Sequence, residues 1–290
     1  MGTSWSARIV DAAPHCANII TSVLAGIIGQ MSNWEAGSDI SRFNRAPIGE
    51  WVSLPDAFMT VLNAGVEIAR LSDGAFDPAI GRLVDGWGFG PAAGAPFSAG
   101  PAGQQSWRQV ELSDGKARRM GDVTLDFSGI AKGFAVDAVA HALRDMGLSQ
   151  FLIEIGGELR GEGVKPDLQP WWVDLEAPPG LIVPVMRVAL CGLSVATSGD
   201  YRRFVTRAGR RLSHSIDPRS GAPIANDVAS VSVLHESAMF ADAWATAITV
   251  LGPDEGMAVA TRHGLAAILI RREGSGAREY MTPTLAAMLD

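Results

Sequence analysis

Residues 122–157 read DVTLDFSGIAKGFAVDAVAHALRDMGLSQFLIEIGG, and this stretch decides the fold. A short strand is predicted at 122–126, and a glycine-containing turn follows it. Apolar residues at helical spacing then predict a helix over 131–146, which ends at a glycine of the kind that often caps helices. A buried strand is expected at 151–155, directly before a Gly-Gly pair. The stretch therefore predicts a strand–helix–strand unit.

The same reasoning extends outward along the chain. Helices are expected at 17–31, 55–70, 238–251 and 254–263. Further strands are expected at 5–10, 107–112, 171–176, 184–191, 228–234 and 265–271, with a Gly- and Pro-rich loop at 86–106. Strands and helices come in runs and do not alternate strictly, which favours an α+β fold over a doubly wound parallel sheet.

The composition limits the classes of protein. The 290 residues are 47% hydrophobic and 19% charged, enough for a substantial core in one large domain or two small ones. A formal charge of −7 argues against nucleic-acid binding. No apolar run reaches the ~18 residues that a membrane span needs, so no transmembrane segment is expected. Cys16 and Cys191 are expected to be small core residues, since their setting suggests neither a disulfide framework nor a zinc site.

Two segments rich in Gly and Asp could carry chemistry. Residues 72–78, SDGAFDP, form a tight turn with two carboxylates, and the turn alone could explain them. Residues 125–134, LDFSGIAKGF, enter a helix through a glycine turn. Free N–H groups at a helix start suit a phosphate, and Lys132 adds a positive charge there. The alternative is a helix N-cap formed by Asp126 and Ser128, but that reading leaves Lys132 unexplained because a cation opposes the helix dipole.

Two later segments contain a candidate base and a candidate metal site. His214 precedes the turn Asp-Pro-Arg-Ser-Gly and lies among polar residues, so it could act as a general base. A lone histidine is more often structural. Asp242 and Thr246 are four residues apart on a predicted helix, hence on one face, and their oxygens suit Mg²⁺. The alternative for Asp242 is a carboxylate favoured by the helix dipole.

Taken together, these segments resemble the ApbE family of FAD:protein FMN transferases. The motifs that carry the resemblance keep their order and approximate spacing along most of the chain. They are Met1–Thr3, Met31–Trp34, Ser38–Asn44, Asp73–Asp77, Gly86–Gly90, Asp126–Asp137, Ile155–Glu158, Ala196–Asp200, His214–Gly221 and Ala241–Thr246. The resemblance implies an α+β fold in which a single domain, residues 1–290, contains two intertwined subdomains with FAD in the cleft between them.

The resemblance also implies an activity. The family cleaves the pyrophosphate of FAD, attaches FMN through a phosphoester to a Thr or Ser of a target flavoprotein, and releases AMP, with Mg²⁺ required. The implied FAD contacts are Met1, Trp34, Ala75, Phe76, Asp77, Asp126, Lys132, Ser198, Gly199 and Ile216. The implied metal ligands are the Gly129 carbonyl, Asp242, the Ala245 carbonyl and Thr246. His214 is the implied base for the acceptor hydroxyl, and Asp242 is expected to be essential for catalysis.

Two further expectations concern partners and location. Targets of the family often carry a DGxTGAT/S-type motif, and no Asp-Gly pair of this chain continues in that way, so self-flavinylation is not expected. Many members are exported lipoproteins, whereas here the first family motif starts at residue 1. A cytoplasmic location is therefore expected for the sequence as written; the alternative is a periplasmic protein whose leader was removed. Two other functions stay open: an FAD pyrophosphatase that yields FMN and AMP, and a flavin-binding protein without turnover.

Overall fold

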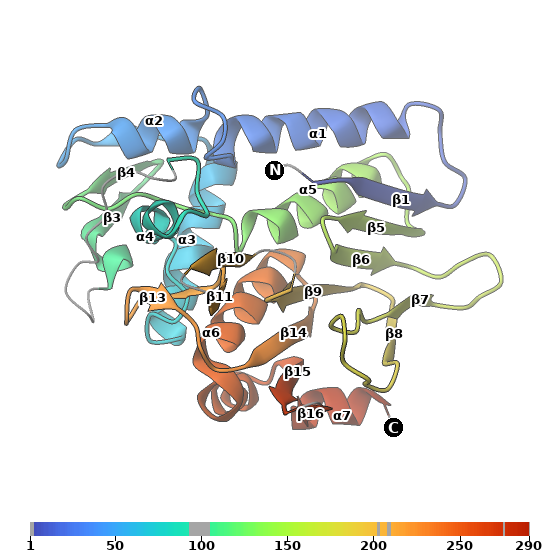
Figure 1. The fold of residues 1–290 in the computed structure, drawn as a ribbon. Helices are drawn as coiled ribbons and strands as arrows, with labels where there is room; N and C mark the ends of the chain where they lie inside the picture. Colours follow the sequence, from blue (N-terminus) through green and yellow to red (C-terminus); the bar gives the residue numbers. More distant parts are fainter. Residues whose placement is uncertain (1–2, 93–104, 202–203, 208–209, 275, 290) are drawn as a thin grey trace.

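A seven-stranded antiparallel sheet forms the centre of the fold (Figure 1). The computed structural model describes residues 3–92, 105–201, 204–207, 210–274 and 276–289. In spatial order the strands are β1 (Trp5–Ile9), β5 (Phe151–Ile155), β6 (Glu158–Glu162), β9 (Leu193–Gly199), β14 (Val228–His235), β15 (Ala266–Glu273) and β16 (Gly276–Met281). Distant parts of the chain thus meet in one sheet, in which β9 lies between β6 and β14.

Helices and small sheets surround this sheet (Figure 1). The α-helices are α1 (Cys16–Met31), α2 (Asp39–Arg45), α3 (Asp56–Leu71), α4 (Gly81–Trp87), α5 (Ala131–Asp145), α6 (Ala238–Arg262) and α7 (Pro283–Leu289), with a 3₁₀ helix η1 (Ser106–Gln109). Strands β2 (Val52–Ser53), β4 (Lys116–Arg119) and β3 (Val110–Ser113) form a three-stranded sheet. Three hairpin-like pairs complete the fold: β7 (Trp171–Asp174) with β8 (Arg187–Leu190), β10 (Phe204–Arg207) with β11 (Arg210–Ser213), and β12 (Ile216–Asp217) with β13 (Ala222–Pro223).

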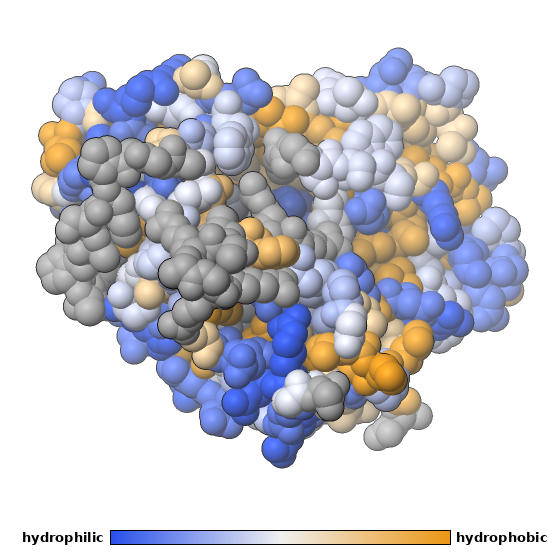
Figure 2. Space-filling model, in the orientation of Figure 1, coloured by the Kyte–Doolittle hydropathy of each residue, from blue (hydrophilic) through white to orange (hydrophobic). Residues whose placement is uncertain are grey.

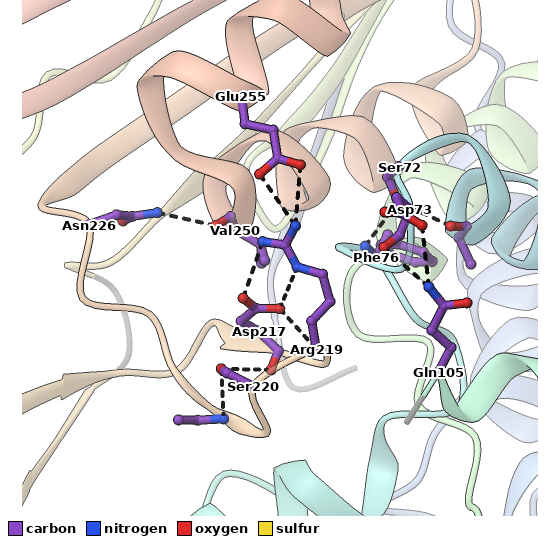
Figure 3. Close-up of polar contacts among 12 residues, drawn as sticks. Ser72, Asp73, Phe76, Gln105, Asp217, Arg219, Ser220, Asn226, Val250 and Glu255 are labelled. Carbon is purple, nitrogen blue, oxygen red and sulfur yellow. Dashed lines mark hydrogen bonds and ion pairs between the residues drawn. The ribbon is translucent and has the colours of Figure 1, made fainter. Parts of the chain in front are cut away.

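Helices α5 and α6 form the buried layer that positions the functional segments. Helix α6 packs against β9, β14 and α5, and most of its first four turns are buried. Its backbone is interrupted at Gly252, where φ is 79°, so the two helices expected at 238–251 and 254–263 are present as two segments of α6. The Asn226 side-chain amide donates to the Thr249 carbonyl at 2.9 Å and to the Val250 carbonyl at 3.3 Å. The contact with Val250 is drawn in Figure 3, and the two bonds satisfy the end of the first segment.

The start of α6 is held by a carboxylate from α5. Asp137 accepts hydrogen bonds from the Ser237 hydroxyl at 2.7 Å and from the N–H groups of Ala238 and Met239 at 2.9 and 3.0 Å. These N–H groups have no partner within the helix, because the first turn of any helix leaves its donors free. Asp137 therefore joins α5 to the N-terminus of α6 as a capping residue supplied by another helix.

Replacing Asp137 with alanine should destabilise the protein by about 2–4 kcal/mol, because the variant loses three hydrogen bonds to a charged acceptor and leaves their donors unpaired. Urea unfolding followed by circular dichroism would measure the loss. Asp145→Ala is the matched control, since Asp145 lies on the same helix with 68% of its side chain exposed. A similar small effect for both variants would contradict the capping role.

The structure corrects four sequence-based predictions. Cys16 is buried as expected, but Cys191 is exposed and is not a core residue. Residues 122–126 form no strand apart from an isolated bridge between Thr124 and Ile80. The backbone of Leu125 is instead satisfied by the Asn44 side chain, which accepts from its N–H at 2.7 Å and donates to its carbonyl at 2.9 Å. The strand expected at 107–112 begins only at Val110, after η1. The loop expected at 86–106 overlaps the end of α4, and its residues 93–104 lie outside the described part.

The α+β class is confirmed by this arrangement of one large antiparallel sheet, several small sheets and packed helices. In the part of the chain that the structure describes, every helix is too short or too polar to cross a membrane. Hydrophilic and hydrophobic residues are intermixed over the visible face of the molecule (Figure 2).

Candidate active site

A pocket of about 750 Å³ gathers nearly all of the predicted site residues. Its walls come from the segment after α1, the turn after α3, the start of α5, the end of β9, the neighbourhood of β12 and one face of α6. The predicted residues that line it are Trp34, Ala75, Phe76, Asp77, Asp126, Gly129, Lys132, Ser198, Gly199, His214, Ile216, Asp242 and Thr246. The volume is in the range of pockets that bind small molecules and cofactors.

Two predicted residues are not placed in this pocket. Met1 lies outside the described residues. Ala245 is fully buried and is not among the residues that line the pocket, and its carbonyl accepts a hydrogen bond from the Thr249 hydroxyl at 2.8 Å. A carbonyl oxygen has a second lone pair, so its role as a metal ligand stays a prediction.

The close approach of α5 to α6 brings Asp242 into contact with the start of α5. The Gly133 N–H donates to Asp242 Oδ2 at 3.0 Å. A Cβ atom at Gly133 would lie 2.1 Å from the Ala238 carbonyl oxygen, closer than any real contact, so only glycine fits there. The α5 start and the α6 carboxylate are therefore held together by a packing contact that has no room for a side chain.

Lys132 lies between two buried carboxylates. Its ammonium pairs with Glu158 Oε1 and lies 3.5 Å from Asp242 Oδ1, while the side chains of Glu158 and Asp242 are only 2% and 4% exposed. Burial opposes the charge of Lys132, but Asp242 and Glu158 outweigh it and raise the lysine pKa. Burial also raises the pKa of Glu158 to about 7, against the lowering effect of Lys132. The positive charge in the first turn of α5 is thus explained by two carboxylates.

Oxygen atoms from β9, α6 and the turn before α5 also meet in the pocket. Thr246 Oγ1 lies 3.2 Å from Ser198 Oγ, and a Cβ atom at Gly129 would lie 2.9 Å from Thr246 Oγ1. Asp242, Thr246 and Gly129 all line the pocket, and all offer the hard oxygen ligands that Mg²⁺ prefers. One lysine faces two carboxylates, and Glu158 Oε2 is buried without a hydrogen-bond partner among the described residues. The donor set therefore fits a divalent cation.

Within the described residues, no three His, Cys, Asp or Glu side chains are gathered as a metal site. The implied ligand set contains a single carboxylate together with a hydroxyl and backbone carbonyls, so this finding does not conflict with it.

Asp77 has a structural position within the pocket wall. Its Oδ1 accepts from the Ala79 N–H at 2.8 Å and its Oδ2 accepts from the Trp107 N–H at 3.1 Å. The neighbouring turn is closed by the Ser72 hydroxyl, which accepts from the Phe76 N–H at 3.1 Å (Figure 3). These bonds fix Phe76 at the pocket wall, so the Ser-Asp-Gly-Ala-Phe-Asp-Pro segment forms both the expected turn and part of the candidate site.

Burial raises the pKa of Asp77 from 3.8 to about 6, although its backbone hydrogen bonds lower it. The folded protein therefore holds the Asp77 proton more tightly than the unfolded chain does. Its stabilising contribution is present below pH 4 and is lost as pH rises through 6. The free energy of unfolding of the parent protein should therefore fall by about 3 kcal/mol more than that of Asp77→Asn when the pH is raised from 4 to 7.5. Denaturant unfolding across this range tests it, with Asp73→Asn in the same turn as the control.

His214 lies on a segment that is anchored to α6 and α4. Asp217 Oδ1 accepts from the N–H and the Nε of Arg219, at 2.9 and 3.0 Å, and the same guanidinium lies 3.3 Å from Glu255 on α6 (Figure 3). The Trp87 indole at the end of α4 donates to the Gly221 carbonyl at 2.8 Å. The His214 ring also packs edge-on against Phe89, with ring centroids 6.3 Å apart. These contacts place the histidine at the pocket wall.

Glu158 is a pocket residue that the sequence did not single out as functional. It is 1% exposed, lies at the start of β6, and follows the glycine pair at the end of β5. A charged residue at an inward position of a strand next to two glycines is the signal that could have identified it. Thr3, Ser32, Ser128, Thr197 and Ser215 also line the pocket without having been predicted as site residues.

Known proteins resemble this chain in sequence. Residues 1–269 match the ApbE family. The chain is 34% identical over 303 residues to the FAD:protein FMN transferase of Vibrio cholerae, which covers 100% of this chain and 90% of that protein. It is 30% identical over 312 residues to that of Escherichia coli K12, which covers 100% of this chain and 87% of that protein.

Solved structures show the same likeness. The apo flavinyl transferase ApbE from Pseudomonas stutzeri superimposes with a TM-score of 0.89 and 35% identity, over 99% of this chain and 94% of that chain. The Vibrio cholerae flavin transferase superimposes with a TM-score of 0.87 and 31% identity, over 99% and 96%. The α+β class and the transferase class expected from the sequence are confirmed by these matches. On both sequence and structure, the chain belongs to the ApbE family.

Proposed function

We propose that this chain is a Mg²⁺-dependent FAD:protein FMN transferase. The observation that carries the proposal is the convergence in one pocket of an oxygen-rich charge cluster, a histidine and aromatic side chains from separate segments. The name of the relatives, FAD:protein FMN transferase, supports the choice of FAD and of an acceptor flavoprotein. We also propose that residues 1–290 act as one domain, since the pocket walls come from residues as far apart as Thr3 and Val250.

The aromatic residues of the pocket suit the rings of FAD. Trp34 is 59% exposed and lies at the pocket surface, whereas Phe76 is buried in its wall. Flat aromatic faces bind flat ring systems by offset stacking. The flavin is cargo in this reaction, which is why the pocket needs groups that bind and orient it and no groups that tune its potential.

The charged end of the pocket suits the pyrophosphate. Asp242, Thr246, the Gly129 carbonyl and the Ala245 carbonyl are the residues we propose to hold Mg²⁺. When bound, Mg²⁺ would neutralise charge on the pyrophosphate and on the departing AMP. Phosphoryl transfer depends mainly on positioning and on charge neutralisation, so a rigid oxygen cluster at the start of α5 is well suited to it.

His214 is the proposed base. The acceptor hydroxyl oxygen forms a bond to the phosphorus of the FMN half, and the bond from that phosphorus to the bridging oxygen breaks. AMP leaves with the bonding electrons, and His214 accepts the hydroxyl proton. The acceptor is a Thr or Ser within a DGxTGAT/S-type motif, as the family resemblance implies.

One experiment distinguishes the possible functions. The protein is incubated with FAD and Mg²⁺, with and without an acceptor domain that carries the motif, and intact mass and AMP are measured. A mass gain of one FMN on the acceptor together with AMP release supports the proposal. AMP and free FMN with an unlabelled acceptor would identify a pyrophosphatase, and unchanged FAD would identify a binding protein.

A further inference from the structure

The two oxygens of Asp242 have different partners. Oδ2 accepts the Gly133 N–H at 3.0 Å, whereas Oδ1 faces the Lys132 ammonium at 3.5 Å. Within the described part of the chain, Oδ1 has no hydrogen bond to the α5 backbone, so a cation can bind to it without changing the α5–α6 contact. A metal ion at Oδ1 and the lysine ammonium carry charge of the same sign, so the two compete for that oxygen.

Glu158 can determine whether the Lys132 ammonium or a metal ion occupies the space beside Asp242 Oδ1. Lys132 makes its closer ionic contact with Glu158 and its longer one with Asp242. Glu158 is fixed because β6 pairs with β5 on one side and with β9 on the other, and Glu158 itself pairs with Ile155. Its side chain is only 2% exposed, so its attraction for the ammonium is weakly screened by water.

We propose that Glu158 is a positioning residue that holds the Lys132 ammonium away from Asp242 Oδ1, and so leaves that oxygen available to the metal ion. This inference rests on the proposed function, since it takes Asp242 as a metal ligand. Without Glu158, the flexible lysine side chain would pair with Asp242 alone and would obstruct the metal. In a protein that lacks Lys132, no ammonium competes with the metal for Asp242. Removing Glu158 from that protein should therefore change metal binding little.

A double-mutant cycle tests this arrangement through metal binding itself. Mg²⁺ alone is titrated by calorimetry, at pH 8.5 to favour ionised carboxylates, into the parent protein, Lys132→Met, Glu158→Gln and the double variant. We expect Lys132→Met to lower the Kd for Mg²⁺ about five- to tenfold, and Glu158→Gln to raise it by a similar factor. The Kd of the double variant should stay close to that of Lys132→Met, because the effect of Glu158 passes through the lysine.

Two further variants make the result decisive. Glu162→Gln removes one negative charge from the same strand, where Glu162 pairs with Arg160, and should leave the Kd unchanged. Glu158→Asp keeps the charge and shortens its reach, so it should also raise the Kd, and it provides the test if Glu158→Gln does not fold. If Glu158→Gln raised the Kd equally with and without Lys132, Glu158 would act on the metal directly and the inference would be wrong.

Failure of this inference differs from failure of the proposed function. A parent protein that binds Mg²⁺ but transfers no FMN would contradict the proposed function and leave the comparison of Kd values intact. A parent that transfers FMN while the four Kd values are equal would contradict only the role of Glu158. A parent that binds no Mg²⁺ would contradict both.

Discussion

Replacing Asp242 with asparagine should reduce FMN transfer by about 10³-fold, the largest effect expected for any single residue of the pocket. The substitution keeps the size of the side chain and removes its charge. A metal ion contributes several kcal/mol of charge stabilisation in phosphoryl transfer, and about 4 kcal/mol corresponds to this factor. The side chain is buried, so water cannot readily take the place of the missing charge.

The rate is measured as the mass gain of an acceptor domain under saturating FAD and Mg²⁺. Asp254→Asn is the matched control, because Asp254 lies exposed on the second segment of α6. Circular dichroism checks that both variants are folded. Turnover in Asp242→Asn equal to that of the parent would remove Asp242 from the metal site.

Replacing His214 with alanine should lower the transfer rate by about 10²- to 10³-fold, since a positioned general base contributes about that much. Binding of FAD should persist, because the aromatic residues and the charge cluster are unchanged. This separation matters: a histidine that only shaped the pocket wall would weaken binding and rate together. Its packing against Phe89 is the reason to measure both quantities.

Flavin fluorescence measures FAD binding in His214→Ala, and acceptor labelling measures the rate. His141→Ala is the control, because His141 lies on α5 with 75% of its side chain exposed. We expect the control to match the parent in both measurements. If His214→Ala transferred FMN at the full rate, a group other than His214 would take the hydroxyl proton.

The predictable part of the fold is the part with strong local periodicity. Helix α5 and strand β5 were predicted within a residue at each end, because their apolar spacing is unambiguous. The segment at 122–126 looks like a strand by composition, but side chains from distant residues satisfy its backbone. No local pattern reveals a partner such as Asn44, which lies 81 residues away.

In the candidate site, too, local motifs could be predicted and contacts between distant residues could not. The sequence identified Lys132 and Asp242 from their positions in helices, and the structure brings both to one pocket. It did not identify Glu158 as the partner of Lys132, because the two are 26 residues apart and meet only when β6 enters the sheet. Chemistry could be predicted wherever a motif is contiguous, whereas the pairing of charges depends on tertiary contacts.

The contact between α5 and α6 has a consequence for mutational scanning of this chain. A library scored only by flavin transfer would show Gly133 to be as intolerant as Asp242, since a Cβ atom at position 133 would overlap the Ala238 carbonyl. The two kinds of intolerance have different origins. A parallel score for the amount of soluble protein should separate them: variants at Gly133 should disappear from both scores, whereas Asp242→Asn should be lost from the activity score alone.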